Sequence, residues 1–363
     1  MNCKFNYHPR ISFCVLTLIR SRLTTLDLSH NRISRVEGLH FLPALEALVL
    51  GITLSRSHFL YELIMIDGNE ISVFPVTSDK PCSALNKLSL RSNRLMTLNL
   101  TEFAPNVRFV HLDGNSLSSL LGFDQLKSLE TLSVRSQNSS TEDQTSLLDN
   151  IPDIHTLDLA GNRLPTIAIS RPLHNLQHLD LSNCGLQSLP ADFGAQAAHV
   201  RTLALNYNGL KDLRPLLGMR RLAALSAVGN RLARLRVAAA ALRLLPALER
   251  LDLRGNPLTV GFYNPGSMRD VAVRAVAPRE PCGGDEGRGP ELPPQDGGVD
   301  SEYVARLDED TRLRRRVYEM LLVSSCKDLR ALDGLEVDQK SVLVKDNTWA
   351  RLVELGVVKK CER

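Results

Sequence analysis

Apolar residues recur along most of this chain in one frame, L-x-x-L-x-L-x-x-N-x-L, with polar residues at the intervening positions. The frame appears at 23–33 (LTTLDLSHNRI) and returns at 85–95, 107–117, 154–164, 176–186, 200–210, 222–232 and 248–258. The central L-x-L predicts a short strand, because alternate side chains of a strand point to opposite faces. The asparagine three residues later predicts a turn, since its amide can bond backbone groups that a turn leaves unpaired.

One copy of the frame is interrupted by residues 51–66. Joining the flanking LEALVL and DGNEI restores a complete repeat and shortens the interval between Asn31 and Asn69 from 38 to 22 residues, as in later repeats. We therefore expect an insertion, either translated intron sequence or a real addition to the protein. In the second case residues 62–66 are expected to compete with residues 47–50 for one position in the sheet.

Two copies replace the turn asparagine, with Gln137 and Cys184. Both are poorer turn residues, so we expect local irregularity there, most of all at 137–150. The arms between strands carry apolar pairs at a spacing that favours 3₁₀ or helical turns. The Ala-rich arm at 234–248 predicts a true helix. Stacked units predict an α/β right-handed solenoid of about ten repeats, with a parallel sheet on the concave face and helical turns on the convex side.

After residue 258 the frame stops. Residues 261–300 hold six prolines and eight glycines, which predicts a flexible loop. Residues 308–322 predict a basic amphipathic helix, and residues 346–356 a final helix. We expect these elements to cap the last open layer. We therefore predict four segments. They are an irregular N-terminal stretch (1–22), the solenoid (23–260), the loop (261–300), and the cap with its terminal helix (301–363).

Composition and chemistry narrow the function. The net charge is only +4 over 363 residues, which by itself indicates neither nucleic acid nor a membrane surface. The seven scattered cysteines form no metal-ligand pattern and suggest reduced thiols in the cytosol or nucleus. The apolar run at 11–19 has no signal-peptide cleavage site, and no run approaches the roughly 20 residues of a membrane span. No catalytic or phosphate-binding motif is present, so we expect neither an enzyme nor a cofactor.

The repeat resembles the leucine-rich repeat family, and its 22-residue units are similar to the intracellular, phosphatase-regulator-like subclass. The segments 256–265, 307–321 and 329–338 resemble the C-terminal domain of the fungal septation-initiation and mitotic-exit scaffolds of the spindle pole body. The matching residues are Asn256, Pro257, Gly261, Phe262, Tyr263, Pro265, Arg314–Tyr318, Leu332, Asp333 and Gly334. Those scaffolds also carry a long N-terminal part, so we expect either a piece of such a protein or a shorter relative.

The concave face is the candidate binding surface, because its polar side chains alternate with the core leucines. The candidate partner-binding residues are Arg91, Phe109, His111, Arg135, Asp158, His178, Asp180 and Asp252. We expect Phe109 to be an exposed anchor flanked by Arg91 and Arg135. Substituting these three together is expected to abolish partner capture without unfolding the chain. Arginines concentrated in 201–256 are either a solvated convex face or a dock for an acidic or phosphorylated segment.

The favoured function is a non-catalytic protein-interaction scaffold, which the resemblance places at the spindle pole body or cytoskeleton in septation-initiation signalling. A regulatory subunit that holds a Ser/Thr phosphatase on its concave face, in the nucleus, is the alternative. An extracellular recognition module is a third, if the N-terminal run is a signal. We expect a monomer with protein partners and no nucleic acid partner.

Overall fold

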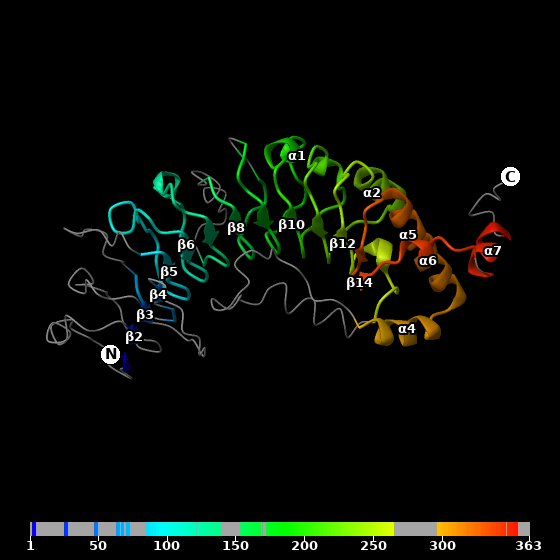
Figure 1. Cartoon of the computed structure of the whole chain (residues 1–363), viewed down its shortest axis with the longest axis horizontal. Coiled ribbons are helices and arrows are strands. Elements are labelled where there is room, and N and C mark those ends of the chain that lie inside the picture. The colour runs from blue at the N-terminus through cyan, green and yellow to red at the C-terminus, as the bar shows by residue number, and fades with distance from the viewer. Residues whose placement is uncertain are drawn as a thin grey trace. The chain divides into compact units, whose positions relative to one another are not determined.

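The computed structural model describes residues 2–4, 25–27, 47–49, 63–65, 67–68, 70–72, 85–120, 122–138, 153–167, 169, 172–264, 296–345 and 347–354. Contacts divide the chain into two units. The N-terminal unit is built around residues 1–180 and the C-terminal unit from residues after 180. Each unit contains a succession of short parallel strands that follow one another in chain order (Figure 1).

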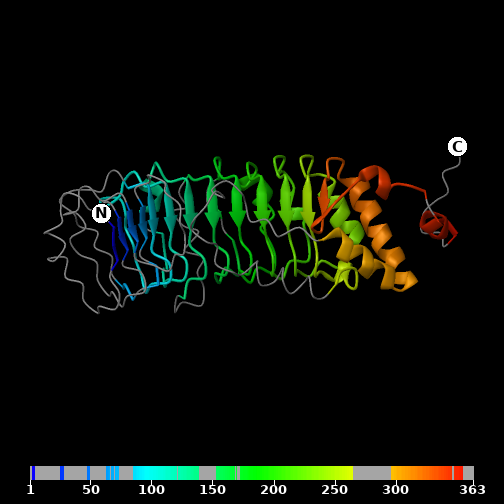
Figure 2. The same ribbon diagram turned by 60° about the horizontal axis from the view of Figure 1, so that its bottom comes forward.

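The described part of the N-terminal unit has nine three-residue strands, each parallel to the next (Figure 2). They are β1 Asn2–Lys4, β2 Thr25–Asp27, β3 Ala47–Val49, β4 Leu63–Met65, β5 Lys87–Ser89, β6 Phe109–His111, β7 Thr131–Ser133, β8 Thr156–Asp158 and β9 His178–Asp180. A short 3₁₀ helix, η3 Phe123–Gln125, lies in the arm between β6 and β7. Strand β1 lies within the segment 1–22 and pairs with the first repeat.

The middle residue of each strand builds the core. Leu88, Val110, Leu132 and Leu157 are partners in register across β5 to β8. All four are essentially inaccessible to solvent. Fully burying such a side chain contributes roughly 1.5–3 kcal/mol to folding. The column of apolar side chains that these residues form therefore stabilises the stack of repeats. This confirms the fold class that the hydrophobic frame predicts.

The turn asparagines join neighbouring repeats. Asn115 donates from Nδ2 to the carbonyl oxygens of Leu112 and Leu90, both at 2.8 Å, and its Oδ1 accepts the Leu95 N–H at 3.1 Å. The same side-chain amide therefore forms hydrogen bonds with backbone groups of its own repeat and of the preceding repeat. Asn230 and Asn256 repeat this pattern in the C-terminal unit.

The expected irregularity at the two substituted turns is wrong for the residues that the structure describes. Gln137 accepts the Leu117 N–H at 3.0 Å and donates to the Leu112 carbonyl oxygen at 2.9 Å, because its longer side chain still reaches the asparagine's partners. The Cys184 turn is held from the next repeat, since Asn208 Oδ1 accepts the Cys184 N–H at 3.0 Å. Most irregularity was expected at 137–150, and residues 139–150 of that segment lie outside the described residues.

The interrupted repeat also differs from its prediction. Strands β3 and β4 do not compete for one position: they pair in parallel with each other, Leu48 opposite Ile64, and β4 then pairs with β5. Residues 63–65 therefore add a strand of their own. The interval between these two paired residues is 16, against 22 between Leu88 and Val110, so this unit is the shorter one.

The C-terminal unit continues with β10 Thr202–Ala204, β11 Ala224–Ser226 and β12 Arg250–Asp252, all parallel. Its arms carry the short helices α1 Phe193–Gln196, η5 Arg214–Leu216, α2 Leu235–Leu242 and η6 Pro257–Thr259. Helix α2 is shorter than the helix predicted over 234–248. It buries three of its alanines and Leu242, so small residues let the arm lie close to the core.

A cap closes this unit after β12. Strand β13 Ala331–Leu332 pairs parallel with β12, and β14 Leu335–Glu336 turns back antiparallel. Helix α5 Glu309–Ser325 packs on α2 and is capped by Asp308, whose carboxylate accepts the Thr311 N–H (Figure 1). The remaining helices are α4 Gly297–Arg306, which begins inside the predicted loop, α6 Gln339–Val342 and α7 Asn347–Glu354. None of the helices in the described segments has the length and apolar character to cross a membrane.

Candidate protein-binding surface

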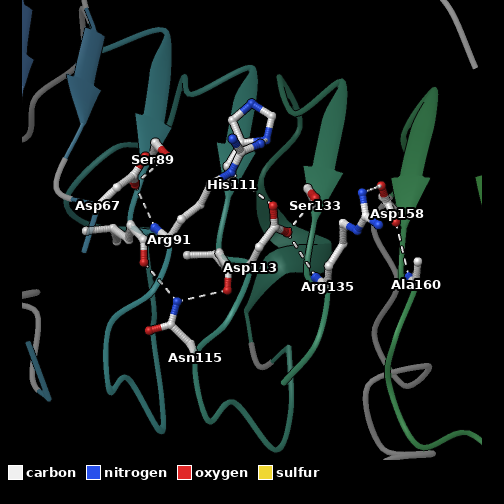
Figure 3. A network of polar contacts seen from close by, with 12 residues as sticks. Asp67, Ser89, Arg91, His111, Asp113, Asn115, Ser133, Arg135, Asp158 and Ala160 are labelled. Atoms are coloured by element: carbon white, nitrogen blue, oxygen red, sulfur yellow. Dashed lines mark hydrogen bonds and ion pairs between the residues drawn. The ribbon is translucent and has the colours of Figure 1, made fainter. Parts of the chain in front are cut away.

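A chain of polar contacts runs along the strand face of the N-terminal unit (Figure 3). It starts at Asp67, two residues after β4. The Asp67 carboxylate accepts the Ser89 hydroxyl at 2.6 Å and the backbone N–H of Arg91 at 2.7 Å. One carboxylate oxygen therefore fixes a side chain and the backbone of the following repeat.

The same arrangement returns two repeats later. Asp113 accepts the Ser133 hydroxyl at 2.6 Å and the Arg135 N–H at 3.0 Å (Figure 3). The two sets are joined because Arg91 Nε lies 2.9 Å from Asp113 Oδ2. The series ends with Arg135, whose Nη1 lies 3.7 Å from Asp158 Oδ2. We call these residues the Asp–Arg ladder: Asp67, Ser89, Arg91, Asp113, Ser133, Arg135 and Asp158.

The ladder has a sequence signal with a period of two repeats. Asp-Gly at 67–68 and 113–114 alternates with Arg-Ser at 91–92 and 135–136. The second residue of each pair has a positive φ, including 52° at Ser92 and 48° at Ser136. Comparing neighbouring repeats rather than single repeats would have revealed this alternation, which the frame alone does not contain.

Burial sets the electrostatics of the ladder. It raises the pKa of Asp67, although the Ser89 hydroxyl opposes the shift, and it raises the pKa of Asp113, which the Arg91 charge opposes. The His111 ring contacts Arg91 Nη2 through Nδ1 at 3.1 Å. Burial and then the Arg91 charge hold the pKa of His111 well below its usual range. His111 is therefore neutral at physiological pH and accepts from the guanidinium.

The structure separates the predicted site residues into two groups. Arg91, Arg135, Asp158 and Asp180 are buried in the N-terminal unit, as is Asp252 in the C-terminal unit. Phe109, His111 and His178 are half-buried. The expected flanking of Phe109 by Arg91 and Arg135 differs from the structure, because those guanidiniums turn to Asp113 and Asp158.

A different arginine flanks Phe109. The Arg108 guanidinium lies 5.3 Å from the centre of the Phe109 ring and pairs with Glu130 at 2.7 Å. Beside this pair is an open hollow of about 540 Å³ lined by Arg108, Asp124, Lys127, Glu130, His155 and Asn175. Its lining mixes both signs of charge. Phe109 is half-buried, whereas Arg91 and Arg135 are buried.

The C-terminal unit holds a second polar cluster, around Asp333. Its carboxylate accepts the hydroxyls of Tyr263 at 2.5 Å and Tyr318 at 2.7 Å, and the Leu253 N–H at 2.6 Å. Burial raises the pKa of Asp333 to about 6, and the nearby Asp252 charge acts in the same direction. Burial also raises the pKa of both tyrosines well above their usual range.

Arg315 ties the cap helices to this cluster. It binds Asp300 through two contacts, at 2.7 and 3.0 Å, and donates to the Phe262 carbonyl oxygen at 2.8 Å. Its guanidinium also lies 4.7 Å from the Tyr263 ring centre. Five of the residues that carry the resemblance to the fungal scaffolds thus meet in one buried cluster: Phe262, Tyr263, Arg315, Tyr318 and Asp333. Sequence reasoning missed Asp300, because the link joins α4 to α5 across a helix boundary.

The described residues contain no group of three or more His, Cys, Asp or Glu side chains that could hold a metal ion. The buried carboxylates instead bind arginine, serine, tyrosine and backbone groups of the chain itself. Both clusters act as internal connections between repeats or between the solenoid and its cap.

Comparison with known proteins agrees with this description. The family model described as Leucine Rich Repeat matches residues 22–44 and 175–195. The septation initiation network scaffold protein cdc11 of Schizosaccharomyces pombe is 27% identical over 239 residues, covering 65% of this chain and 23% of cdc11. Podocan-like protein 1 of Mus musculus is 29% identical over 263 residues, covering 69% of this chain and 43% of that protein. The chain spans less than half the length of these relatives.

Among solved structures, the TLR13 chain of a TLR13–ssRNA13 complex matches with a TM-score of 0.53 and 23% identity, over 66% of this chain and 33% of that one. This likeness supports the fold alone. The name of cdc11 describes that protein as a scaffold of the septation initiation network. The repeat frame, the stacked parallel strands and the segments matched by the family model agree that this chain has the fold of a leucine-rich repeat solenoid.

Proposed function

We propose that this protein is a non-catalytic scaffold of septation-initiation and mitotic-exit signalling that binds protein partners at the spindle pole body. The observation that carries the proposal is the similarity to the cdc11 scaffold over 239 residues. The residues that resemble the fungal scaffolds give it a physical basis, because Tyr263, Tyr318 and Asp333 form one hydrogen-bonded cluster.

The accessible surface suits such a role. The first residues of β5 to β9 form a half-buried row on the strand face, in register from Lys87 through Phe109 to His178. A partner chain can contact this row without disturbing the buried ladder beside it. Aromatic and arginine side chains are enriched at binding hot spots, and Phe109 with Arg108 provides both.

A chimaera tests the proposal. The part of cdc11 that aligns with this chain is replaced by this chain, and the fusion carries a fluorescent tag in Schizosaccharomyces pombe cells depleted of cdc11. We expect discrete spots at both spindle poles through mitosis and restored septation. A matched fusion that lacks the repeat segment controls for recruitment by the rest of cdc11.

The natural chain gives the complementary measurement. A tagged copy in its own cells is expected at spindle poles, coincident with a spindle-pole marker. Diffuse nuclear signal with co-purification of a Ser/Thr phosphatase would instead support the phosphatase-subunit alternative. Secretion into the medium would support an extracellular recognition module, and either outcome would overturn the scaffold proposal.

A further inference from the structure

Positive charge is concentrated in one part of the C-terminal unit. Residues 201–256 contain eleven basic side chains, ten of them arginine, against Asp212, Glu249 and Asp252, a net charge of +8. The whole chain carries +4, so the remaining residues carry a net −4. Charge is therefore distributed very unevenly along the chain, although the net charge of the whole chain is small.

Five of these basic residues lie along one edge. They follow the turns at Asn208 and Asn230, and all five side chains are exposed. Strands β10 and β11 are parallel, so their following turns lie at the same end of the strands. The Arg231 N–H donates to the Leu210 carbonyl oxygen at 2.9 Å, and η5 contacts α2. We call this the arginine edge: Lys211, Arg214, Arg231, Arg234 and Arg236.

Internal ion pairs leave most of the arginine edge uncompensated. Asp212 pairs with Arg214. Within the part of the chain that the structure describes, Lys211, Arg231, Arg234 and Arg236 have no carboxylate within ion-pair distance. By contrast, the buried Arg254 binds Asp252 through contacts as short as 2.6 Å. The arginines that serve the fold are thus distinguishable from those on the edge.

Stability does not explain the placement of two of these residues. Arg234 is the N-cap of α2 and makes no side-chain cap hydrogen bond, and the first turn of α2 contains no acidic residue. Ser, Thr, Asp and Asn are the favoured caps, and cations near a helix N-terminus oppose the helix dipole. Arg234 and Arg236 therefore weaken the helix start rather than support it.

The composition of the arginine edge favours phosphate groups carried by a protein. Four of its five members are arginine, whose planar guanidinium binds phosphate oxygens through two parallel hydrogen bonds. Neighbouring strands lie about 4.8 Å apart, so guanidiniums of adjacent repeats can reach one phosphorylated segment together. In 181–264 the aromatic side chains are buried except for half-buried Tyr207, so no platform for stacked bases accompanies the charge.

We propose that the arginine edge binds a phosphorylated serine- or threonine-bearing segment of a partner protein. Arg231, Arg234 and Arg236 hold the phosphate oxygens, and Lys211 adds charge at the neighbouring repeat. Phosphorylation of the partner then controls its attachment to the C-terminal unit. The proposal does not depend on which signalling system the scaffold serves, because it rests on the edge alone.

The test measures binding of a fluorescein-labelled Gly/Ser peptide with two phosphoserines to the full chain by fluorescence anisotropy. The unphosphorylated peptide is the ligand control. Arg231→Glu/Arg236→Glu reverses two charges on the arginine edge, and glutamate at 236 suits the helix dipole, so folding is retained. Arg220→Glu/Arg221→Glu makes the same charge change before β11, at the opposite end of the strand. Circular dichroism checks the fold of each variant.

We expect the edge variant to raise the Kd of the phosphopeptide by roughly tenfold or more, from loss of charge-assisted hydrogen bonds. The control variant is expected to change Kd by less than about twofold at 0.15 M salt, where the Debye length is about 8 Å. Equal losses in both variants, or no saturable binding of the phosphopeptide, would overturn the proposal. So would tighter binding of a single-stranded oligonucleotide of equal charge, or of phosphatidylserine vesicles.

Discussion

Substitution of Asp113 is the sharpest test of the ladder, because one carboxylate there serves three groups. It accepts the Ser133 hydroxyl and the Arg135 N–H, and it pairs with Arg91. Asp113→Ala leaves all three without this partner. Breaking a buried ion pair from one side costs about 3–5 kcal/mol. We expect Asp113→Ala to lower the free energy of unfolding of the N-terminal unit by about this amount.

Asp113→Asn separates geometry from charge. Its Oδ1 still accepts both hydrogen bonds, but an NH2 group replaces the Oδ2 atom that faces Arg91 Nε, so the ion pair and its acceptor are lost. The C-terminal unit contains a natural precedent: Asn206 Oδ1 accepts the Ser226 hydroxyl at 2.7 Å and the Val228 N–H at 2.9 Å. We therefore expect Asp113→Asn to cost about 1–3 kcal/mol, less than the alanine variant.

The assay must report on the N-terminal unit. The single tryptophan, Trp349, lies in α7 of the C-terminal unit, so its fluorescence is unsuitable. Urea unfolding followed by far-UV circular dichroism gives the free energy, and hydrogen–deuterium exchange of peptides within 85–138 gives the location. Equal losses for the alanine and asparagine variants would refute the reasoning, as would unchanged protection of 85–138 in the alanine variant.

Two further predictions concern the C-terminal unit. The pKa of Asp333 is raised to about 6, above its usual 3.8, so the folded state holds this proton more tightly than the unfolded chain. The contribution of Asp333 to stability is thus largest below about pH 4 and declines as pH rises towards 6. Asp333→Asn should remove that part of the pH dependence, measured as urea midpoints by Trp349 fluorescence, and an unaltered pH profile would contradict it. Gly194→Ala places a Cβ 2.0 Å from the Leu217 carbonyl oxygen. We expect this clash to lower the free energy of unfolding by about 1–3 kcal/mol or more, measured by urea unfolding. An unchanged free energy would show that the arm shifts to accommodate the added Cβ.

The repeat frame was predictable because it is local. Each copy contains its own strand, turn and apolar slots, so Leu88, Val110 and Leu132 could be assigned to the core without knowing their neighbours. The helix over 308–322 was predictable for the same reason, and α5 extends three residues beyond it. Local pattern and global fold agree in these elements.

The ladder was not predictable from single repeats, because its contacts join residues twenty or more positions apart. Asp113 and Arg91 each look like an exposed polar residue on a strand face when read within one repeat. Strand pairing in register brings them to 2.9 Å, and mutual neutralisation then makes their burial tolerable. The position of residues 63–65 also depends on the stacking of strands. A strand that enters the sheet gains backbone hydrogen-bond partners from the strands on both sides.

These contacts change where a partner is to be sought on the concave face. The residues of the Asp–Arg ladder bind one another, so substitution of Arg91 or Arg135 would remove buried ion pairs. Loss of folding could then not be distinguished from loss of partner binding. The row that begins each strand has no such role in the ladder. Phe109 is half-buried, lies beside Arg108, and has a neighbour in that row on each side, Lys87 and Thr131. Its truncation removes contact surface while Asp113 keeps its partners, so a partner of the concave face is to be tested there.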